Sequence, residues 1–474
     1  MSESDLFFAE GTAIQCRNFF GVAVHKFKTE FLRAMNTSTE KRRRLVLISC
    51  LWAFASAALH AENWPQWRGP AFNGSTTEEN LPATWSKTEN IVWTAPLPGP
   101  SGATPVIWGD HVFVSSPDPE KTLLLFCFNR ADGSVRWRKQ VALGDKSVGR
   151  NNMAAPSPVT DGKSVFILYG TGDFAAYDFA GDELWKRNVG KDHGKFSIMW
   201  IYGSSPLLFE GRLYVQVLQR DPPPGDYPLT DDKPTRESYL LCVDPKTGKD
   251  LWRQVRKTDS TKESQEAYTT PIPYRGKNGS EILVVGGDHI SGHNAVTGAE
   301  LWRTRMYEKR DDWYRIVTSP VAADGLIYAS GPKGQPVIAL KDGGKGDLAA
   351  SHVAWSFKEA PTDWSTPLLY QKKLFVLDGG KKILTCLDPK TGEKKWQGNL
   401  GVTETFWSSP TGADGKIYCL GERGTVVVLD AGDEFKILST IPMGDEPCKS
   451  SIAAAHGQLF IRTAKSLYCV GLKK

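Results

Sequence analysis

The stretch DPKTGKDLW, residues 244–252, returns almost unchanged as DPKTGEKKW at residues 388–396. Each copy is typical of a turn followed by a strand, because Pro and Gly favour turns and aromatic residues favour strands. A phrase that occurs twice in one chain indicates a repeated structural unit. The sequence therefore predicts a fold that is built from repeats.

Looser copies of this phrase follow one another along the chain. They end at Trp137, Trp185, Trp252, Trp302, Trp355 and Trp396, with Trp93 before them and Leu438 in the last position. Successive positions lie 41 to 67 residues apart, which suits four-stranded propeller blades with loops of different lengths. The spacing predicts eight such units.

A second phrase, Ser/Thr-Pro followed by apolar residues and a Gly turn, alternates with the first. It begins at Thr104, Ser157, Ser205, Thr270, Ser319, Thr366 and Ser409, with a degenerate copy at Ser450. Between the two phrases lie alternating runs such as RLYVQV at 212–217, which indicate half-buried strands. The pattern predicts an all-β fold, an eight-bladed β-propeller of four-stranded antiparallel blades over residues 90–474.

The order of the two phrases predicts how the ring closes. The strand that contains Trp93 precedes the first inner strand, whereas the last unit ends with SLYCVG at 466–471. The N-terminal strand is therefore expected to complete the eighth blade. This closure would pair the two sheet edges that an open ring leaves bare.

Residues 1–61 are predicted to direct export rather than to join the fold. Basic residues 41–44 precede the apolar run 45–59, and Ala61 follows as a small residue before a cleavage point. The signal peptide is expected over 35–61, with Met35 as the start and 1–34 as a non-structural extension. An uncleaved anchor is the alternative, although a membrane span needs about 20 apolar residues. The mature chain is expected in the periplasm or outside the cell, with no transmembrane span.

The charge balance argues against nucleic acid as a partner. Residues 62–474 carry 50 Lys and Arg against 48 Asp and Glu, a nearly neutral total. A nucleic-acid-binding surface needs a concentrated basic footprint, and the sequence contains none.

The two phrases resemble the pyrroloquinoline-quinone (PQQ) type repeat of β-propellers over residues 90–474. The stretch NWPQWRGP at residues 63–70 is similar to the segment that leads into propellers of this family, so a lead-in is expected over 62–89. The family includes quinoprotein alcohol dehydrogenases and the propeller subunit of the outer-membrane β-barrel assembly machine. The resemblance implies that the outer tryptophans dock one blade on the next, and it leaves the function open.

The loops that precede the inner strands, here called the entering loops, are unusually aromatic. Repeat geometry places them on one face around the axis, and a concave mouth of aromatic and polar groups is typical of a binding site. The candidate ligand-binding residues are Arg150, Asn152, Trp200, Tyr202, Tyr268, Trp313, Tyr314, Trp364, Trp407 and Lys449. The alternative is that these rings plug the narrow end of the channel. The same loops carry the carboxylates Glu266, Asp312 and Asp363.

The cysteines and histidines do not form a metal motif. Four cysteines follow the repeat and are expected to fill small buried positions, whereas Cys419 and Cys448 fall outside it and are candidates for a disulfide. His289 and His293 flank a strand–turn region, where their spacing is not that of a zinc site. A proline-rich stretch at 218–238 interrupts the third unit on the mouth face, as a lid, a docking arm or tolerated length.

Two functions remain open from the sequence. The first is an exported binding or scaffold module of the cell envelope, with a small-molecule or glycan ligand or an envelope protein partner. The second, implied by the resemblance, is a PQQ-dependent alcohol dehydrogenase that holds PQQ and calcium in the mouth and uses a carboxylate as base. Against it, the chain lacks the adjacent cysteine pair and the C-x-x-C-H haem site found in many such enzymes. No residue is assigned as catalytic.

Overall fold

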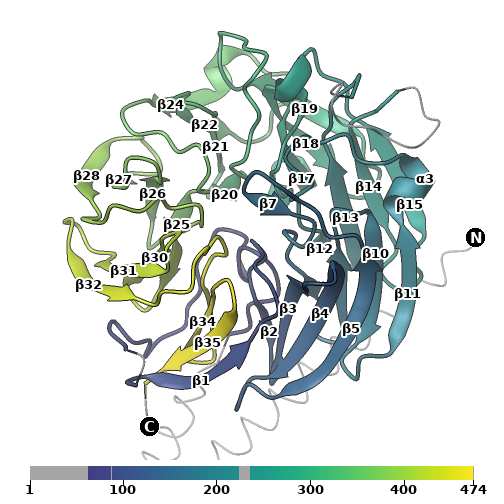
Figure 1. Ribbon diagram of the computed structural model, residues 1–474. Helices are drawn as coiled ribbons and strands as arrows, with labels where there is room; N and C mark the ends of the chain where they lie inside the picture. The colour runs from purple at the N-terminus through teal and green to yellow at the C-terminus, as the bar shows by residue number, and fades with distance from the viewer. Residues whose placement is uncertain (1–61, 87, 224–234, 473–474) are drawn as a thin grey trace, which may run out of the picture. The chain divides into compact units, whose positions relative to one another are not determined.

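A computed structural model describes residues 62–86, 88–223 and 235–472. Residues 61–474 form one compact unit, in which eight four-stranded sheets stand around a central axis (Figure 1). The predicted eight-bladed β-propeller is confirmed. The expected N-terminal extension and signal peptide lie outside the described residues. Among those that are described, no helix is both long and apolar enough to cross a membrane.

The first four blades follow one another along the chain, each built from the axis outward. Their strands are β2 (Val106–Trp108), β3 (His111–Pro117), β4 (Thr122–Asn129) and β5 (Val135–Leu143); β8 (Val159–Thr160), β9 (Ser164–Leu168), β10 (Asp173–Asp178) and β11 (Glu183–Asn188); β12 (Leu207–Phe209), β13 (Arg212–Val217), β14 (Tyr239–Val243) and β15 (Asp250–Val255); and β16 (Ile272–Gly276), β17 (Gly279–Gly286), β18 (His289–Asn294) and β19 (Glu300–Arg305).

The other four blades complete the ring, and the last one takes its outer strand from the N-terminal side. Their strands are β20 (Val321–Ala323), β21 (Leu326–Ser330), β22 (Val337–Lys341) and β24 (Val353–Phe357); β25 (Leu368–Tyr370), β26 (Lys373–Asp378), β27 (Ile383–Leu387) and β28 (Lys394–Asn399); β29 (Thr411–Ala413), β30 (Lys416–Leu420), β31 (Thr425–Asp430) and β32 (Ile437–Pro442); and β33 (Ala453–Ala455), β34 (Gln458–Arg462), β35 (Ser466–Gly471) and β1 (Ile91–Pro96).

A few short elements lie between the blades. They are the hairpin of β6 (Ser147–Val148) and β7 (Asn151–Asn152), helix α3 (Val189–His193), β23 (Gly346–Asp347), which pairs parallel with β19, and 3₁₀ turns at Lys262–Gln265 and Ala350–His352. The β6–β7 hairpin and the turn at Lys262–Gln265 take part in the mouth of the channel.

The ring closes through the N-terminal strand, as the sequence predicts. Strand β1 pairs antiparallel with β35, with Trp93 opposite Cys469. Figure 1 shows the purple β1 beside the yellow β35. The eighth blade therefore joins residues from both ends of the described chain, and its edge strand is hydrogen-bonded rather than bare.

The outer tryptophans hold neighbouring blades together. The ring of Trp355 covers the turn at Gly392, where an added Cβ would lie 2.5 Å from it, and Trp355 Nε1–H donates to Pro389 O at 2.9 Å. Only glycine fits under such a ring. The same packing is found for Trp93 on Gly133, Trp137 on Gly181, Trp185 on Gly248 and Trp252 on Gly298. Trp93 extends this docking across the closure.

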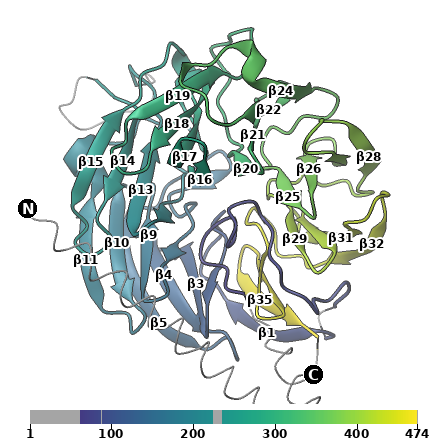
Figure 2. The same ribbon diagram turned by 180° about the vertical axis from the view of Figure 1, so that it is seen from behind.

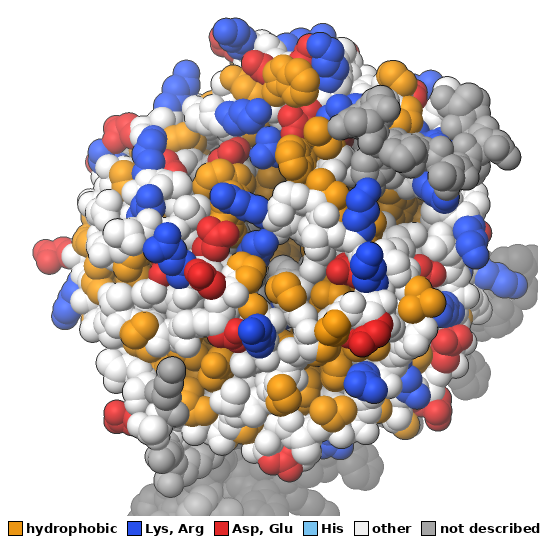
Figure 3. All heavy atoms as spheres, in the orientation of Figure 1, with side chains coloured by type: hydrophobic (Ala, Val, Ile, Leu, Met, Phe, Trp, Pro, Cys, Tyr) orange, Lys and Arg blue, Asp and Glu red, His pale blue; other side chains and the backbone are white. Residues whose placement is uncertain are grey.

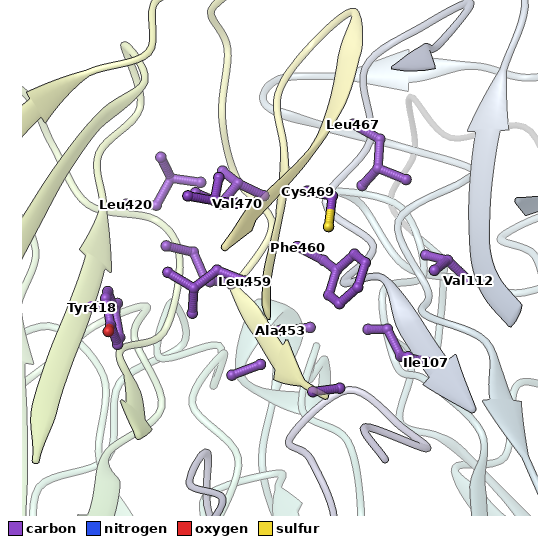
Figure 4. Packing of buried hydrophobic residues seen from close by; sticks show 14 of the residues in the cluster. Ile107, Val112, Tyr418, Leu420, Ala453, Leu459, Phe460, Leu467, Cys469 and Val470 are labelled. Carbon is purple, nitrogen blue, oxygen red and sulfur yellow. The ribbon is translucent and has the colours of Figure 1, made fainter. Parts of the chain in front are cut away.

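The hydrophobic core is divided among the contacts between blades. Strands in the middle of each blade are buried on both faces, because each blade is sandwiched between two others; β4 is an example. Figure 4 shows one cluster in which Tyr418 of the seventh blade, Phe460 of the eighth and Ile107 of the first take part. The closing blade is thus packed on both sides.

Cys419 and Cys448, the candidates for a disulfide, are both buried free thiols. Cys419 packs in the cluster between the sixth and seventh blades, whereas Cys448 packs in the cluster around the eighth. The two side chains belong to different contacts between blades, so this candidate pair does not form.

The lead-in segment crosses the back of the ring, opposite the entering loops (Figure 2). Trp64 is fully buried and bridges to Ile107 of β2, and farther along Ser75 bridges to Gly412 beside β29. Between these points the segment passes the axis. It therefore links blades on both sides of the closure and covers the rear of the channel.

Candidate functional site

A cavity of about 480 Å³ lies at the axis, on the face of the entering loops. Figure 3 shows this face hollowed near its centre, with Lys, Arg and hydrophobic side chains around the hollow. Its volume falls in the range of pockets for small ligands. The mouth is therefore open rather than filled by its own rings.

One wall of the cavity comes from the third to fifth entering loops. Trp200 and Tyr268 face the cavity, and Trp200 N–H donates to Tyr268 Oη at 3.1 Å. Trp200 Nε1–H donates to Glu263 Oε1 at 2.8 Å, and Arg315 Nη1 lies 3.4 Å from the same oxygen. These contacts fix the Trp200 and Tyr268 rings in place.

A buried acid lies behind this wall. Glu266 is fully buried, accepts Tyr268 Oη–H at 2.8 Å, and lies 2.7 Å from Arg220 Nε. Burial raises the pKa of Glu266, while Tyr268 and Arg220 act in the opposite direction. The carboxyl is occupied in orienting Tyr268 and does not face the cavity.

The opposite wall comes from the sixth to eighth entering loops and is held by contacts between tilted rings and a cation. The rings of Trp364 and Trp407 have centroids 4.2 Å apart, and the Arg150 guanidinium lies 4.3 Å from the Trp407 ring centroid. Lys449 Nζ donates to Arg150 O. Burial lowers the pKa of Lys449; Glu422 acts in the opposite direction, and the positive charge of Arg150 adds to the lowering.

The β6–β7 hairpin spans the mouth between the two walls. Figure 1 shows β7 close to the centre of the ring. At the tip, Gly149 has φ +58° and lies so close to Trp200 that an added Cβ would be 2.9 Å from its ring. Arg150 reaches Trp407 on the far side, while Asn151 Nδ2–H donates to Trp200 O at 3.1 Å. The hairpin therefore ties the walls together.

The lead-in segment supplies one further ring to the cavity. Trp67 lines it, and the neighbouring Arg68 is buried. Arg68 donates to Pro367 O and Pro410 O, both at 3.0 Å, at the points where two inner strands begin. Burial lowers the pKa of Arg68 to about 9. Arg68 anchors the segment so that Trp67 stays at the axis.

A ring of hydroxyl groups surrounds the same axis. In each case a backbone N–H of one blade donates to the Ser or Thr hydroxyl of the next. The pairs are Thr104 to Ser157, Ser157 to Ser205, Ser205 to Thr270, Thr270 to Ser319, Ser319 to Thr366, Thr366 to Ser409 and Ser409 to Ser451, at 2.8 to 3.1 Å. The ring is interrupted where the eighth blade meets the first, since the buried hydroxyl of Thr104 has no partner among the described residues.

Six of the ten candidate residues line the cavity. They are Arg150, Trp200, Tyr268, Trp364, Trp407 and Lys449. The sequence analysis finds these residues because each entering loop delivers its side chains at a fixed distance from a Ser/Thr-Pro phrase.

The other four candidates lie elsewhere. Tyr202 is buried in its blade and donates to Gln216 O at 2.9 Å, and Asn152 Nδ2–H donates to Pro100 O at 2.7 Å. Tyr314 packs edge-on against Tyr307, and Trp313 is 50% exposed outside the cavity. Each of these loops turns once before its inner strand, so neighbouring residues point in different directions.

Sequence reasoning also missed several lining residues. Arg315 and Val317 lie one turn beyond Trp313 in the same loop, and Trp67 belongs to the lead-in. Trp67 lies in the stretch WPQWRGP, whose resemblance to the family predicts a lead-in segment but not a side chain in the cavity. A lone segment that crosses an axis has no repeat to reveal its position.

A family model described as outer membrane protein assembly factor BamB matches residues 73–215, 236–360 and 346–434. These segments cover most of the chain and contain the repeats found in the sequence. The chain belongs to this family. It is one of the PQQ-repeat propellers. A comparison with curated proteins finds no match.

Solved structures that this chain resembles include BamB and alcohol dehydrogenases. BamB from Moraxella catarrhalis has a TM-score of 0.56 and 13% identity, covering 80% of this chain and 99% of its own. Quinohemoprotein alcohol dehydrogenase from Comamonas testosteroni has a TM-score of 0.63 and 12% identity, and the match covers 87% of this chain and 81% of its own. A europium-containing methanol dehydrogenase has a TM-score of 0.65 and 11% identity, and the match covers 85% of this chain and 90% of its own. At these identities the PQQ-repeat propellers share a fold, and the site must decide the function.

The donor set of this PQQ-repeat propeller does not fit calcium-supported PQQ chemistry. Calcium takes six to eight oxygen ligands, with carboxylates prominent among them. Among the described residues, none that lines the cavity is Asp or Glu, and no cluster of three His, Cys, Asp or Glu side chains is placed to hold a metal. Three cationic side chains in the wall also disfavour a divalent cation.

The carboxylates of the entering loops are all engaged elsewhere. Asp312 pairs with Lys262 at 2.7 Å, and Asp363 accepts the Lys333 backbone N–H at 2.9 Å. Glu266 is buried behind Tyr268. None of these three carboxylates lines the cavity, where the base of an alcohol oxidation would have to lie.

The two histidines considered for zinc bond within their own blade. His289 Nδ1 lies 2.7 Å from Gly287 O, and His293 Nε2 lies 3.0 Å from Ser291 Oγ. Burial lowers the pKa of His293 to about 4, so the ring is neutral at physiological pH. The pair packs the fourth blade.

Proposed function

We propose that this chain is a binding module of the cell envelope that holds a small ligand in the central cavity. One observation carries the proposal. Trp67, Trp200, Trp364 and Trp407 meet around one open cavity, although no repeat rule requires any of them. Tryptophan rings exposed in a concave site are costly to leave in water, and they gain from stacking on a ring-shaped ligand.

The envelope location rests on two supports. The first is the predicted signal peptide over 35–61, with its basic residues, apolar run and small-residue end. The second is the description of the family as an outer-membrane assembly factor. The mature chain is proposed to act in the periplasm or outside the cell.

The ligand is proposed to be a small molecule or a glycan unit rather than a protein segment. The cavity has a volume of about 480 Å³, with rings on both walls and a further ring from the lead-in. A protein partner would need a broad interface of about 800 Å² on this chain. An envelope partner at another surface is compatible with this use of the cavity.

Oxidation of an alcohol with PQQ and calcium receives no support from the donor set. The related dehydrogenases share the fold, but the cavity offers neither carboxylate ligands nor a carboxylate base among the described residues. PQQ itself remains a useful test compound, because it is flat and acidic.

The test is a crystallographic soak of the mature chain, residues 62–474, with a library of small ring compounds. Ring compounds are expected in the cavity, stacked on the tryptophans. The double variant Trp364→Ala, Trp407→Ala should lose them, whereas Trp313→Ala should retain them, since Trp313 is an exposed tryptophan of the same face outside the cavity. Compounds bound only elsewhere, or equal binding by both variants, would contradict the proposal.

A further inference from the structure

The charged side chains that line the described part of the central cavity are all cationic, and its other polar side chains are mainly hydroxyl groups. Arg150, Arg315 and Lys449 line it, and none of these side chains can accept a hydrogen bond. Trp407 Nε1 is also a donor, and it has no partner among the described residues. The described part of the lining contains no carboxylate to balance these groups.

The hydroxyl ring adds donors to the same wall. Six of its members line the cavity, namely Ser157, Ser205, Thr270, Thr366, Ser409 and Ser451. Each of these oxygens already accepts a backbone N–H from the preceding blade. Each hydroxyl also has one proton to donate, and within the described chain none of the six donates it to another protein atom. The hydroxyl oxygens therefore accept hydrogen bonds between blades, while the hydroxyl protons are available to a ligand in the cavity.

The cationic groups differ in how far they are neutralised. Arg315 lies 3.4 Å from Glu263 Oε1, which offsets part of its charge. Arg150 and Lys449 form no ion pair with any described residue, and they lie together at the wall of Trp364 and Trp407. Arg150 repels Lys449, and Glu422 attracts Lys449 without forming an ion pair, so a bound anion would relieve the repulsion that remains. The charge of the cavity is thus concentrated at this wall.

We propose that the cavity binds an oxyanion-bearing ring without a metal ion, with the oxyanion at Arg150 and Lys449, further oxygens on the hydroxyl ring and the ring face on the tryptophans. This inference rests on the proposed function and names the chemistry of its ligand. Charge-assisted hydrogen bonds to Arg and Lys are the strong ones. A neutral ring would leave these donors without acceptors, which costs binding energy.

Two sources can supply this chemistry, an aromatic carboxylate or an acidic sugar. Both present a ring of suitable size with oxygens at its edge. The experiment therefore compares benzene-1,3,5-tricarboxylate with D-glucuronate by isothermal titration calorimetry on the mature chain. Each anion has a neutral counterpart of similar shape, benzene-1,3,5-trimethanol and methyl β-D-glucoside.

At least one anion is expected to bind ten-fold or more tightly than its neutral counterpart. The anion that binds more tightly identifies the source. Added calcium should not strengthen the binding. If the neutral rings bind as tightly as the anions, the cavity is a binding site but this inference fails. If calcium is required, the metal-free part fails. If none of the four compounds binds, both the inference and the proposed function are contradicted.

Variants locate the anion. Lys449→Met should weaken the preferred anion about ten-fold or more, and Lys449→Arg should restore most of the affinity because it keeps the charge. Lys358→Met is the matched control, since Lys358 is exposed beyond the outer strand of the fifth blade and does not line the cavity. Equal effects of Lys449→Met and Lys358→Met, at unchanged melting temperatures, would overturn the assignment.

Discussion

Trp355 and Trp364 lie close together in the sequence but serve two regions of the molecule. Trp355 is on the outer strand β24, only 9% exposed, with its ring on Gly392 and its N–H bonded to Pro389 O. Trp364 is at the mouth, where it faces the cavity and stacks with Trp407. The same residue type holds blades together in one region and leaves a ring face accessible in the other.

The difference shows how to separate structure from function in a repeat protein. A tryptophan that recurs at the same position of every unit serves the contact that every unit shares. A tryptophan that lies outside this repeated position does not serve that contact. Packing explains the outer seam completely, whereas the rings at the mouth need a ligand to explain their exposure.

The largest effect is expected from removing the residues that close the ring. Deleting residues 62–97 removes β1, the docking of Trp93 and the lead-in with Trp67. The eighth blade would then expose β35 as an edge strand, so aggregation is expected. Size-exclusion chromatography and thermal melting measure this, with the chain that starts at Glu62 as control. A truncated chain that stays monomeric with an unchanged melting temperature would contradict the role of β1.

The outer seam should be sensitive to one substitution. Trp355→Ala removes a buried ring over Gly392 and is expected to cost about 3–5 kcal/mol of unfolding free energy. Trp355→Phe keeps most of the packing but loses the hydrogen bond to Pro389 O. Losing that bond is expected to cost about 1 kcal/mol, in addition to the cost of replacing the indole by a smaller ring. Urea denaturation measures both. If Trp355→Ala costs no more than an exposed substitution, the docking does not stabilise the seam.

The fold was predictable because propeller blades repeat the same physical problem. Each blade must bury two faces and place a turn under the outer tryptophan of the preceding blade, so the phrases around Trp252 and Trp396 recur. The closure by β1 followed from the order of the phrases. The lack of a disulfide between Cys419 and Cys448 could not be seen, since two residues outside the repeat have no register that fixes their distance.

The hydroxyl ring both joins neighbouring blades and lines the cavity, so a substitution in it should affect stability and ligand binding. Ser205→Ala leaves the Ser157 N–H buried without its acceptor, and a cost of about 1–3 kcal/mol is expected. Ser205→Thr keeps the hydroxyl and is the control. The measurement is urea denaturation with calorimetry of benzene-1,3,5-tricarboxylate binding. Unchanged stability in Ser205→Ala would show that this hydrogen bond is not needed at the seam.

The site was predictable only in part, because loops do not repeat. The distance from each Ser/Thr-Pro phrase places Trp364 and Trp407 at the axis, since their loops are short. The longer fifth entering loop presents Arg315 to the cavity and Trp313 to solvent. Trp67 comes from a segment with no second copy, so pattern reasoning had nothing to compare it with.

The mouth should tolerate the substitution that damages the outer seam. Trp364→Ala is expected to cost about 1 kcal/mol or less, because the ring is only half-buried and faces the cavity. Binding of the preferred anion should fall about ten-fold through lost stacking. Thermal melting and calorimetry together test this. A stability loss as large as that of Trp355→Ala would mean that Trp364 serves packing.

The smallest effect concerns pH at Lys449. Burial and the charge of Arg150 lower the pKa of this ammonium from its usual 10.5, and Glu422 acts in the opposite direction. The group therefore loses its proton, and with it part of the anion affinity, at a lower pH than an exposed lysine would. The effect on folding has the opposite sign: the unfolded chain binds this proton more tightly, so the contribution of Lys449 to stability rises with pH through the lowered pKa. Calorimetry with benzene-1,3,5-tricarboxylate from neutral pH upward should show weakening affinity in the natural chain and a flatter profile in Lys449→Arg, since arginine keeps its charge. Profiles that fall in parallel would place the titrating group elsewhere.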